Sequence, residues 1–189
     1  DDSYTWQSIN RVADGELHVL AGVPMRVHAI PGHTVDSLGF ELEEDGIVFT
    51  GDTLLGKGSS MVGAGLMAEM LSTLARLQEL AEAGSGRGFP GHGDILEDLG
   101  AAAASRLSAR ARRIAEVEAM AQAGASGDEI AAALYAHVTD AELQRAARPP
   151  VESILHYLNG REQGATLGAP ARGARAGVLR IRPRSRPRR

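Results

Sequence analysis

The chain contains 189 residues, of which 43% are apolar, 23% are charged and only 4% are aromatic, a composition typical of a folded globular protein with one or two small domains. The sequence has no cysteine, which excludes disulfides, thiolate zinc ligands and a cysteine nucleophile. Any metal ion must therefore be bound by histidine, aspartate or glutamate, and six histidines are available.

The formal net charge of −4 conceals two regions of opposite sign. Residues 161–189 carry nine arginines and one glutamate, a net charge of +8, whereas residues 1–160 carry 11 basic and 23 acidic side chains, a net charge of −12. The acidic body argues against electrostatic capture of nucleic acid by the folded part, although the arginine-rich tail has the charge to contact phosphate. No apolar run approaches the roughly 20 residues that span a bilayer. We therefore expect no membrane association and a cytoplasmic location.

The first third of the chain predicts a β-meander. Four β-prone segments follow one another, and the third alternates apolar and polar side chains as a half-buried strand does. These segments are Glu16–Leu20, Met25–Ile30, Ser37–Glu43 and Ile47–Thr50. Gly46 is expected to take a positive φ in the hairpin turn before the last strand.

Most of the rest of the chain predicts helices. Apolar side chains recur at i, i+3, i+4 and i+7 from Ala68 to Ala83, and this pattern stops at Gly84. A loop follows, containing glycine, serine and arginine. An alanine-rich helix is then predicted from about residue 101 to residue 122.

Two more helical segments begin with capping-box patterns at Ser126 and Thr139, each with glutamate three residues later. The prolines at 149–150 are expected to break or kink the last helix, and Gly160 is expected to end it. The tail from residue 161 predicts disorder, except for a strand-like segment at Gly177–Ile181.

Three short glycine-containing motifs each place one potential metal ligand at the end of a predicted strand. They are Pro31-Gly32-His33-Thr34, Thr50-Gly51-Asp52-Thr53 and Pro90-Gly91-His92-Gly93. Two imidazoles and a carboxylate are donors that zinc accepts, and strand-end loops on a rigid sheet can bring ligands together from distant parts of a chain. His33, Asp52 and His92 are therefore the candidate metal ligands.

The residues and order of these motifs resemble the second half of the metallo-β-lactamase superfamily. The resemblance covers roughly residues 12–99, with 19 residues from His33 to Asp52 and 40 from Asp52 to His92. The resemblance implies an α/β fold, the αβ/βα sandwich that holds one or two zinc ions. In that family the histidine of Pro-Gly-His-Thr binds the first zinc, the aspartate of Gly-Asp-Thr bridges both, and the histidine of Pro-Gly-His-Gly binds the second. The corresponding residues here are His33, Asp52 and His92.

Within the superfamily, the segment Gly51–Gly58 and the helical region after the last motif are most similar to the lactamase-β-2-like branch, which includes single-strand-specific endoribonucleases. This resemblance implies a partial metallo-β-lactamase-like domain at 1–100, a small helical winged-helix-like domain at 101–160 and an arginine-rich tail at 161–189. Zinc β-lactamases of the main class carry cysteine at the position of Asp52, so antibiotic hydrolysis is not favoured.

The family's His-x-His-x-Asp-His motif has no counterpart in residues 1–32, where the histidines are His18 and His28. In an unbroken strand, His28 and His33 would lie on opposite faces about 16 Å apart, so neither replaces the motif. Two interpretations stay open. Either the upstream half is missing from this sequence, which the absent initiator methionine favours, or the protein is a degenerate relative that no longer binds a metal pair.

The resemblance implies a zinc-dependent hydrolase that uses metal-activated water on a phosphodiester or ester, with single-stranded RNA or a small ester or thioester as substrate. The first alternative is thioester hydrolysis as in glyoxalase II, which shares the motifs but has a different C-terminal helical domain. The second is a non-catalytic remnant or nucleic-acid-binding module. The general base belongs to the missing motif, so no catalytic residue is assigned.

Outside the three motifs, the sequence favours structural roles. Thr53 is expected to hydrogen-bond loop backbone through its hydroxyl. The methionines near the predicted 68–83 helix are expected to fill gaps in the core; they are Met61, Met67 and Met70. The basic cluster at 110–113 is expected to be a solvated helix surface, with phosphate contact as the alternative.

Overall fold

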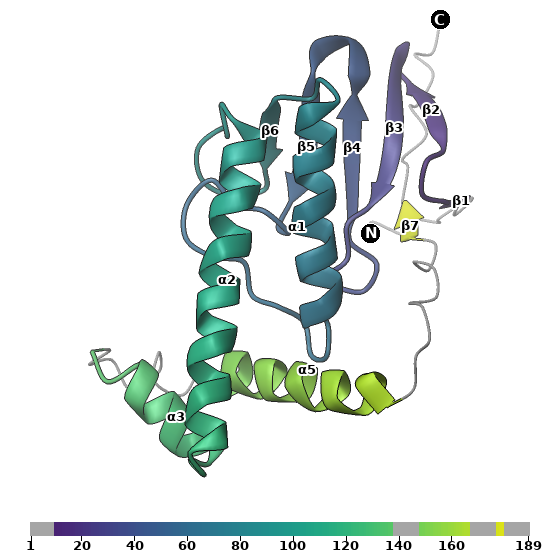
Figure 1. Cartoon of the computed structure of the whole chain (residues 1–189). Helices are drawn as coiled ribbons and strands as arrows, with labels where there is room; N and C mark the ends of the chain where they lie inside the picture. The colour runs from purple at the N-terminus through teal and green to yellow at the C-terminus, as the bar shows by residue number, and fades with distance from the viewer. Residues whose placement is uncertain (1–9, 138–147, 167–176, 180–189) are drawn as a thin grey trace, which may run out of the picture.

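The computed structural model describes residues 10–137, 148–166 and 177–179 and contains a mixed five-stranded sheet (Figure 1). The strand order is β2 (Leu17–Leu20), β3 (Val23–Ala29), β4 (Leu38–Leu42), β5 (Ile47–Gly51) and β6 (Arg87–Pro90). The pairs from β2 to β5 are antiparallel, which confirms the predicted meander, whereas β6 pairs with β5 in parallel.

The turn before β5 has the predicted geometry. A 3₁₀ turn over Glu43–Asp45 ends at Gly46, whose φ of 64° lies in the left-handed region that favours glycine. The backbone therefore reverses between β4 and β5 without strain.

Strand β6 confirms the strand predicted before the His92 motif, although the loop of glycine, serine and arginine predicted after Gly84 ends earlier than expected. Its four residues include Gly88 and Pro90, which have low intrinsic strand propensity. A Cβ at Gly88 would lie 3.0 Å from atoms of both Leu96 and Leu99, so the glycine allows the strand to approach the segment that leads into the next helix. Pairing with β5 and this packing form the strand, and neither is visible as a local pattern.

Two long helices cover one face of the sheet and stand side by side in Figure 1. They are α1 (Met67–Glu82), which confirms the predicted 68–83 helix, and α2 (Leu99–Gln122). The Asp98 side chain caps α2 by accepting a 2.8 Å hydrogen bond from the Ala101 amide.

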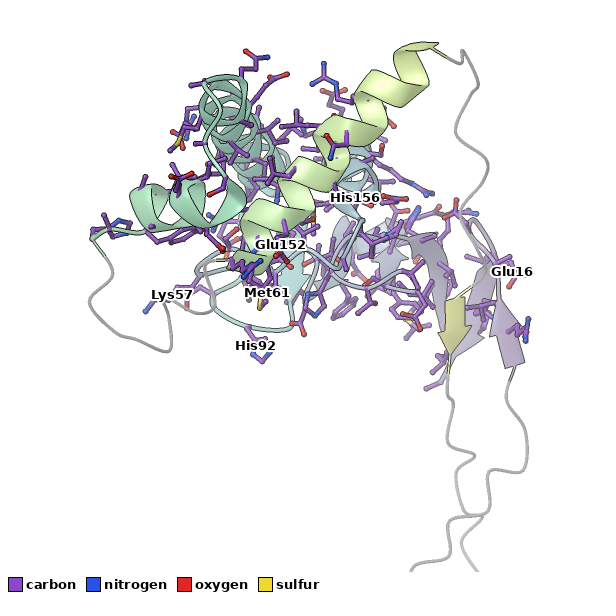
Figure 2. The ribbon with its side chains drawn as sticks, turned by 90° about the horizontal axis from the view of Figure 1, so that it is seen from below. Glu16, Lys57, Met61, His92, Glu152 and His156 are labelled. Atoms are coloured by element: carbon purple, nitrogen blue, oxygen red, sulfur yellow. The ribbon has the colours of Figure 1, made fainter. Side chains whose placement is uncertain are left out.

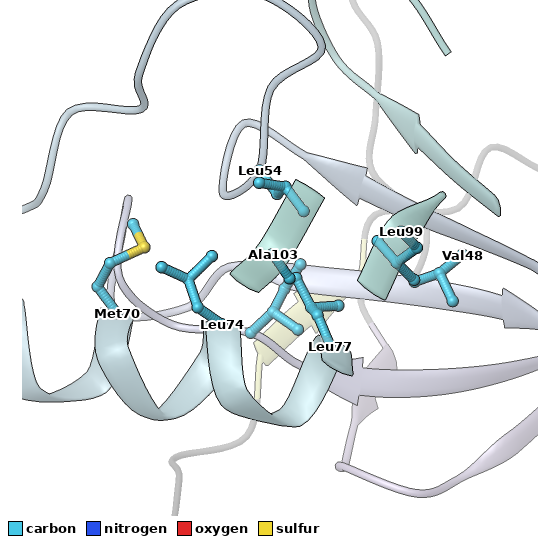
Figure 3. Packing of buried hydrophobic residues seen from close by; sticks show 8 residues of the cluster. Val48, Leu54, Met70, Leu74, Leu77, Leu99 and Ala103 are labelled. Carbon is cyan, nitrogen blue, oxygen red and sulfur yellow. The ribbon is translucent and has the colours of Figure 1, made fainter. Parts of the chain in front are cut away.

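The main core fills the space between these helices and the sheet (Figure 3). Its fully buried members come from the sheet, the 52–56 loop and both helices: Ile30, Val48, Leu54, Met70, Leu74, Leu77, Leu99 and Ala103. The burial of this cluster ties the strand ends to α1 and α2, and thereby gives the loops at the sheet edge a rigid base.

A second apolar cluster joins the lower half of α2 to α3 (Gly127–Leu134) and α5 (Arg148–Thr166). The predicted capping box is present, because Ser126 Oγ accepts from the Glu129 amide while the Glu129 carboxylate accepts from the Ser126 amide. The second predicted box, at Thr139, lies outside the described residues. Figure 1 shows α5 running below the lower end of α1 from beside the lower half of α2.

The prolines at 149–150 stand in the first turn of α5, where proline needs no hydrogen-bonding amide. The segment before them, in which the preceding helical turn was predicted, lies outside the described residues. One expectation for the last helix was wrong. Gly160 does not end the helix, which continues to Thr166. Interior glycine costs only about 1 kcal/mol relative to alanine, and the Arg161 guanidinium lies over the Tyr157 ring at 5.9 Å across this position.

A separate two-stranded ribbon pairs β1 (Asn10–Val12) with β7 (Gly177–Leu179) in antiparallel register. Strand β7 falls in the strand-like part of the predicted tail. The elements described between residues 99 and 166 are the helices α2, α3 and α5. The winged-helix-like character of this region and the domain boundary at 100 stay predictions.

In the residues that the structure describes, no helix is both long enough and apolar enough to cross a membrane.

Candidate functional site

The sheet topology brings the three motif loops to one edge. Strand β4 runs antiparallel to both β3 and β5, and β6 runs parallel to β5, so β3, β5 and β6 share one direction. His33, Asp52 and His92 each follow the carboxyl end of one of these strands within four residues. The edge at which the three motifs meet is therefore a consequence of strand direction.

Asp52 and His92 are brought together at this edge. The His92 Nε2 atom lies 3.5 Å from the Asp52 Oδ1 atom. Asp52 Oδ1 is buried, yet it accepts no hydrogen bond from the part of the chain that the structure describes. The His92 side chain is 76% exposed, and Figure 2 shows it projecting from the body of the molecule. The Asp52 side chain is 42% exposed, so both partners reach solvent and only the Oδ1 atom is shielded from it.

The separation of these two atoms fits a shared metal ion. Zinc binds histidine nitrogen and carboxylate oxygen at about 2.0–2.2 Å, and two such ligands at a tetrahedral centre lie about 3.4 Å apart. The observed 3.5 Å separation matches that value and is long for a hydrogen bond. The shielded Asp52 Oδ1 atom has no donor in the described residues, and a cation would satisfy it.

Glycines allow the Asp52 and His92 loops to lie against each other. The Gly91 amide donates to the Gly51 carbonyl at 2.8 Å, and the Gly56 amide donates to the His92 carbonyl at 3.1 Å. A Cβ at Gly91 would stand 2.5 Å from Asp52 Oδ1. The glycine beside His92 is therefore required by the close approach of the neighbouring carboxylate.

His33 has its proton placed by a backbone carbonyl. Its Nδ1 atom lies 3.0 Å from the Met61 carbonyl oxygen. Because a carbonyl only accepts, Nδ1 carries the hydrogen, and Nε2 keeps the lone pair that a metal ion requires. The ring is half-buried. His33 therefore has the protonation state that a metal-binding imidazole requires.

The His33 loop is attached to α1 and to the 57–66 loop. The Gly63 amide donates to the Gly32 carbonyl at 2.8 Å, and Thr73 Oγ1 on α1 donates to the Pro31 carbonyl at 2.7 Å. Within the described ranges, three or more metal-binding side chains do not gather at one point. The structure thus brings together Asp52 and His92, with His33 at the same edge but outside that pair.

The neighbouring threonine and methionines have definite positions. Thr53 Oγ1 donates to the Ile30 carbonyl at 3.0 Å, which confirms its predicted structural role. Met67 and Met70 are buried, as predicted. Met61 is not part of the core: the residue is 62% exposed, and it is its backbone carbonyl that contacts His33.

A buried polar network under α1 was not found from the sequence. His28 Nε2 lies 2.7 Å from Glu41 Oε2, and both side chains are almost fully buried. Its Nδ1 atom lies 3.0 Å from Arg76 Nη2, a donor, so Nδ1 accepts and Nε2 donates to Glu41. Ser85 donates its hydroxyl to the other Glu41 oxygen. His28 is thereby committed to the core.

The network reaches the surface at Asp14. Arg76 contacts both Asp14 oxygens at 2.9 Å, and the Ala29 amide donates to Asp14 at 2.8 Å. Burial alone would raise the pKa of Asp14, but the hydrogen bonds from Arg76 and Ala29 and the positive charge of Arg76 together hold that pKa below its usual value. The sequence contained one indication of this network, namely the glutamate at position 41 within a predicted strand.

The residues of this chain match a known family. A family model described as the metallo-beta-lactamase superfamily matches residues 3–117. A lactamase-like protein from Pestalotiopsis fici is 28% identical over 165 residues, covering 82% of this chain and 51% of that protein. An atrochrysone carboxyl ACP thioesterase from Aspergillus novofumigatus is 30% identical over 176 residues, covering 86% of this chain and 52% of that protein. The chain thus spans about half the length of these relatives.

Solved structures have the same fold. A metallo-beta-lactamase family protein from Thermus thermophilus superposes with a TM-score of 0.66 at 27% identity, covering 90% of this chain and 54% of that one. A beta-lactamase domain protein from Burkholderia ambifaria gives a TM-score of 0.67 at 21% identity, covering 81% of this chain and 47% of that one.

Proposed function

Because this chain belongs to the metallo-β-lactamase superfamily of hydrolases, we propose that it supplies part of the active site of a metal-dependent hydrolase that cleaves a thioester or ester. The observation that carries the proposal is the Asp52–His92 pair, whose facing atoms are spaced as two ligands of one ion and whose buried oxygen has no donor in the described residues.

In this proposal Asp52 Oδ1 and His92 Nε2 hold a zinc ion, and His33 Nε2 is a third donor at the same edge. When bound, such an ion supplies a Lewis acid that polarises a carbonyl group and lowers the pKa of a water molecule.

The chain's own groups prepare the donors. The contact between the Gly51 carbonyl and the Gly91 amide keeps Asp52 beside His92. The Met61 carbonyl holds the His33 proton on Nδ1, so Nε2 would be free to bind a metal ion. The exposure of His92 leaves the pair open to an approaching substrate.

A thioester or ester is favoured over RNA for two reasons. Residues 1–160 carry a net charge of −12, which repels a polyanion. Relatives with about 30% identity over most of this chain are named as thioesterases that act on a carrier-protein substrate. The proposal therefore prefers thioester hydrolysis, which was the alternative in the sequence analysis, to the phosphodiester chemistry expected there.

Zinc binding by the 189-residue chain tests the proposal. The expected result is measurable zinc binding that weakens about tenfold or more in Asp52→Asn and in His92→Gln. Asp45→Asn, in the exposed turn before β5, is the matched control and should bind zinc as the wild type does. Equal zinc affinity in Asp52→Asn and wild type would refute the assignment.

Substrate class is tested separately with the zinc-loaded protein. Cleavage of an acyl-coenzyme A thioester in preference to a nitrophenyl phosphodiester is expected, and the loss of this activity in Asp52→Asn should follow the loss of zinc. Preferential cleavage of the phosphodiester would replace the thioester proposal with the nuclease-like one.

A further inference from the structure

We propose that Arg110 is a positioning residue for the metal site: from α2 it holds the Ser60–Met61 backbone so that the Met61 carbonyl keeps the His33 proton on Nδ1. This inference rests on the proposed role of His33 as a ligand, although its central test does not require metal.

The contacts form a continuous path from the helix to the imidazole. Arg110 Nη2 donates a 2.8 Å hydrogen bond to the Ser60 carbonyl. The next carbonyl along the chain, that of Met61, lies 3.0 Å from His33 Nδ1. The Ser60 hydroxyl also donates to the Met61 carbonyl at 3.1 Å. Arg110 and His33 thus both contact carbonyl groups of the same short segment, Ser60–Met61.

This segment lies outside the regular elements and depends on side-chain support. It belongs to the connection between β5 and α1, and the structure places no helix or strand between Thr53 and Leu66. Beyond Arg110, the nearby support is the hydrogen bond from the Gly63 amide to the Gly32 carbonyl. A charge-assisted bond from a guanidinium is stronger than a neutral one and fixes the direction of the carbonyl it meets.

Stability alone does not explain an arginine at position 110. The side chain is half-buried, and its Nε atom is buried without a partner in the described part of the chain. Burial and the nearby Arg106 guanidinium both lower the pKa of Arg110, and in the described residues no carboxylate is among the causes that act on this pKa. Partial desolvation of a cation without a paired anion costs folding free energy, so an apolar side chain of similar length would cost less at this position.

The neighbouring arginines of the predicted basic cluster make different contacts. Arg112 donates to the Ser108 hydroxyl on its own helix at 3.0 Å. Arg113 lies 3.5 Å from Glu116, and its guanidinium lies 5.4 Å from the centre of the Tyr135 ring. Since Arg112 is exposed and contacts its own helix, it provides a matched control for Arg110.

The test is the location of the His33 proton in the metal-free 189-residue chain at about pH 8, where a free imidazole is neutral. Long-range nitrogen–hydrogen correlation spectra distinguish Nδ1–H from Nε2–H, and His33→Gln identifies the His33 signals. The variants are Arg110→Met, Arg110→Gln, Arg110→Lys and the control Arg112→Met.

The wild type is expected to carry the proton on Nδ1. In Arg110→Met and Arg110→Gln the Nε2–H form should become at least comparable to the Nδ1–H form, because the Met61 carbonyl loses its fixed direction. Arg110→Lys, which keeps a cationic donor of similar reach, should restore the wild-type distribution, and Arg112→Met should not change it. A wild-type distribution in a folded Arg110→Met or Arg110→Gln protein overturns the proposal, as does an equal change in Arg112→Met.

Zinc affinity separates this inference from the proposed function. Arg110→Met should weaken zinc binding about threefold to tenfold, at or below the range found when a direct partner of a ligand is removed. If the wild-type chain binds no zinc, the proposed function fails, whereas the proton location still decides whether Arg110 positions His33.

Discussion

Replacing Gly91 with alanine should weaken zinc binding far more than it weakens the fold. The added Cβ would lie 2.5 Å from Asp52 Oδ1 and 3.3 Å from the Gly51 carbonyl carbon. A 2.5 Å approach is shorter than any normal contact, so the Asp52 carboxylate must rotate away. Its displacement removes Oδ1 from the position 3.5 Å from His92 Nε2.

The cost in stability is small because two effects oppose each other. Overpacking a well-packed site costs about 1–3 kcal/mol, while alanine in place of glycine restricts the unfolded chain and contributes about 0.4–1 kcal/mol of stability. The net loss is about 1 kcal/mol, which lowers the Tm of a chain this size by about 2–4 °C. Loss of a ligand position, by contrast, should weaken zinc binding about tenfold or more.

Thermal unfolding and a zinc titration of the same preparations measure both effects. Gly86→Ala is the matched control, since a Cβ there has no atom within 4 Å, and it should leave zinc affinity unchanged. Zinc affinity in Gly91→Ala within about twofold of the wild type would show that the carboxylate beside Gly91 is not a ligand, and an equal loss in Gly86→Ala would show that the effect is not local.

Three further predictions concern the fold that supports the site. Leu74→Ala should lower the free energy of unfolding by about 2–5 kcal/mol in urea denaturation, because Leu74 is buried in the main core, whereas Leu17→Ala, at a side chain that is 56% exposed, should change it by less than about 0.5 kcal/mol. The pKa of Asp14 lies below its unfolded value, so the ionised carboxylate stabilises the fold above about pH 4, and this contribution disappears as pH falls through the folded pKa. The difference in unfolding free energy between wild type and Asp14→Asn, measured from about pH 7 to about pH 2, should therefore shrink at the acid end. A constant difference would contradict the ion pair with Arg76. Ser126→Ala should cost about 1 kcal/mol by removing the capping box of α3, measured by thermal unfolding, and no change in Tm would contradict the cap.

Local sequence patterns predicted where the strands and helices lie better than which face of each is buried. The alternation from Leu38 to Leu42 correctly identified β4. Gly39 and Glu41 are the buried residues of this strand, whereas its three apolar residues are half-exposed. Glu41 is acceptable there because His28 and Ser85 donate to it. Period alone does not reveal which face a helix will cover.

The motifs predict His33, Asp52 and His92 as ligands, and the structure brings Asp52 and His92 together at a distance that the sequence could not give. The glycine beside His92 indicated a close approach. The 3.5 Å spacing of Asp52 and His92 depends on the parallel pairing of β5 and β6, strands from different parts of the chain. The contribution of Arg110 depends on α2 packing beside the 57–66 loop, a tertiary contact that carries no local signal.

The hydrogen bonds at the sheet edge connect its ligand loops into two groups. Backbone hydrogen bonds join the loops of Asp52 and His92, whereas His33 is attached to α1 and the 57–66 loop. The Thr53 hydroxyl, bonded to the Ile30 carbonyl, connects the two groups. Any displacement of α1 along the sheet would therefore change the distance from His33 to the other two donors, and the hydrogen bond between Thr53 and Ile30 would oppose it.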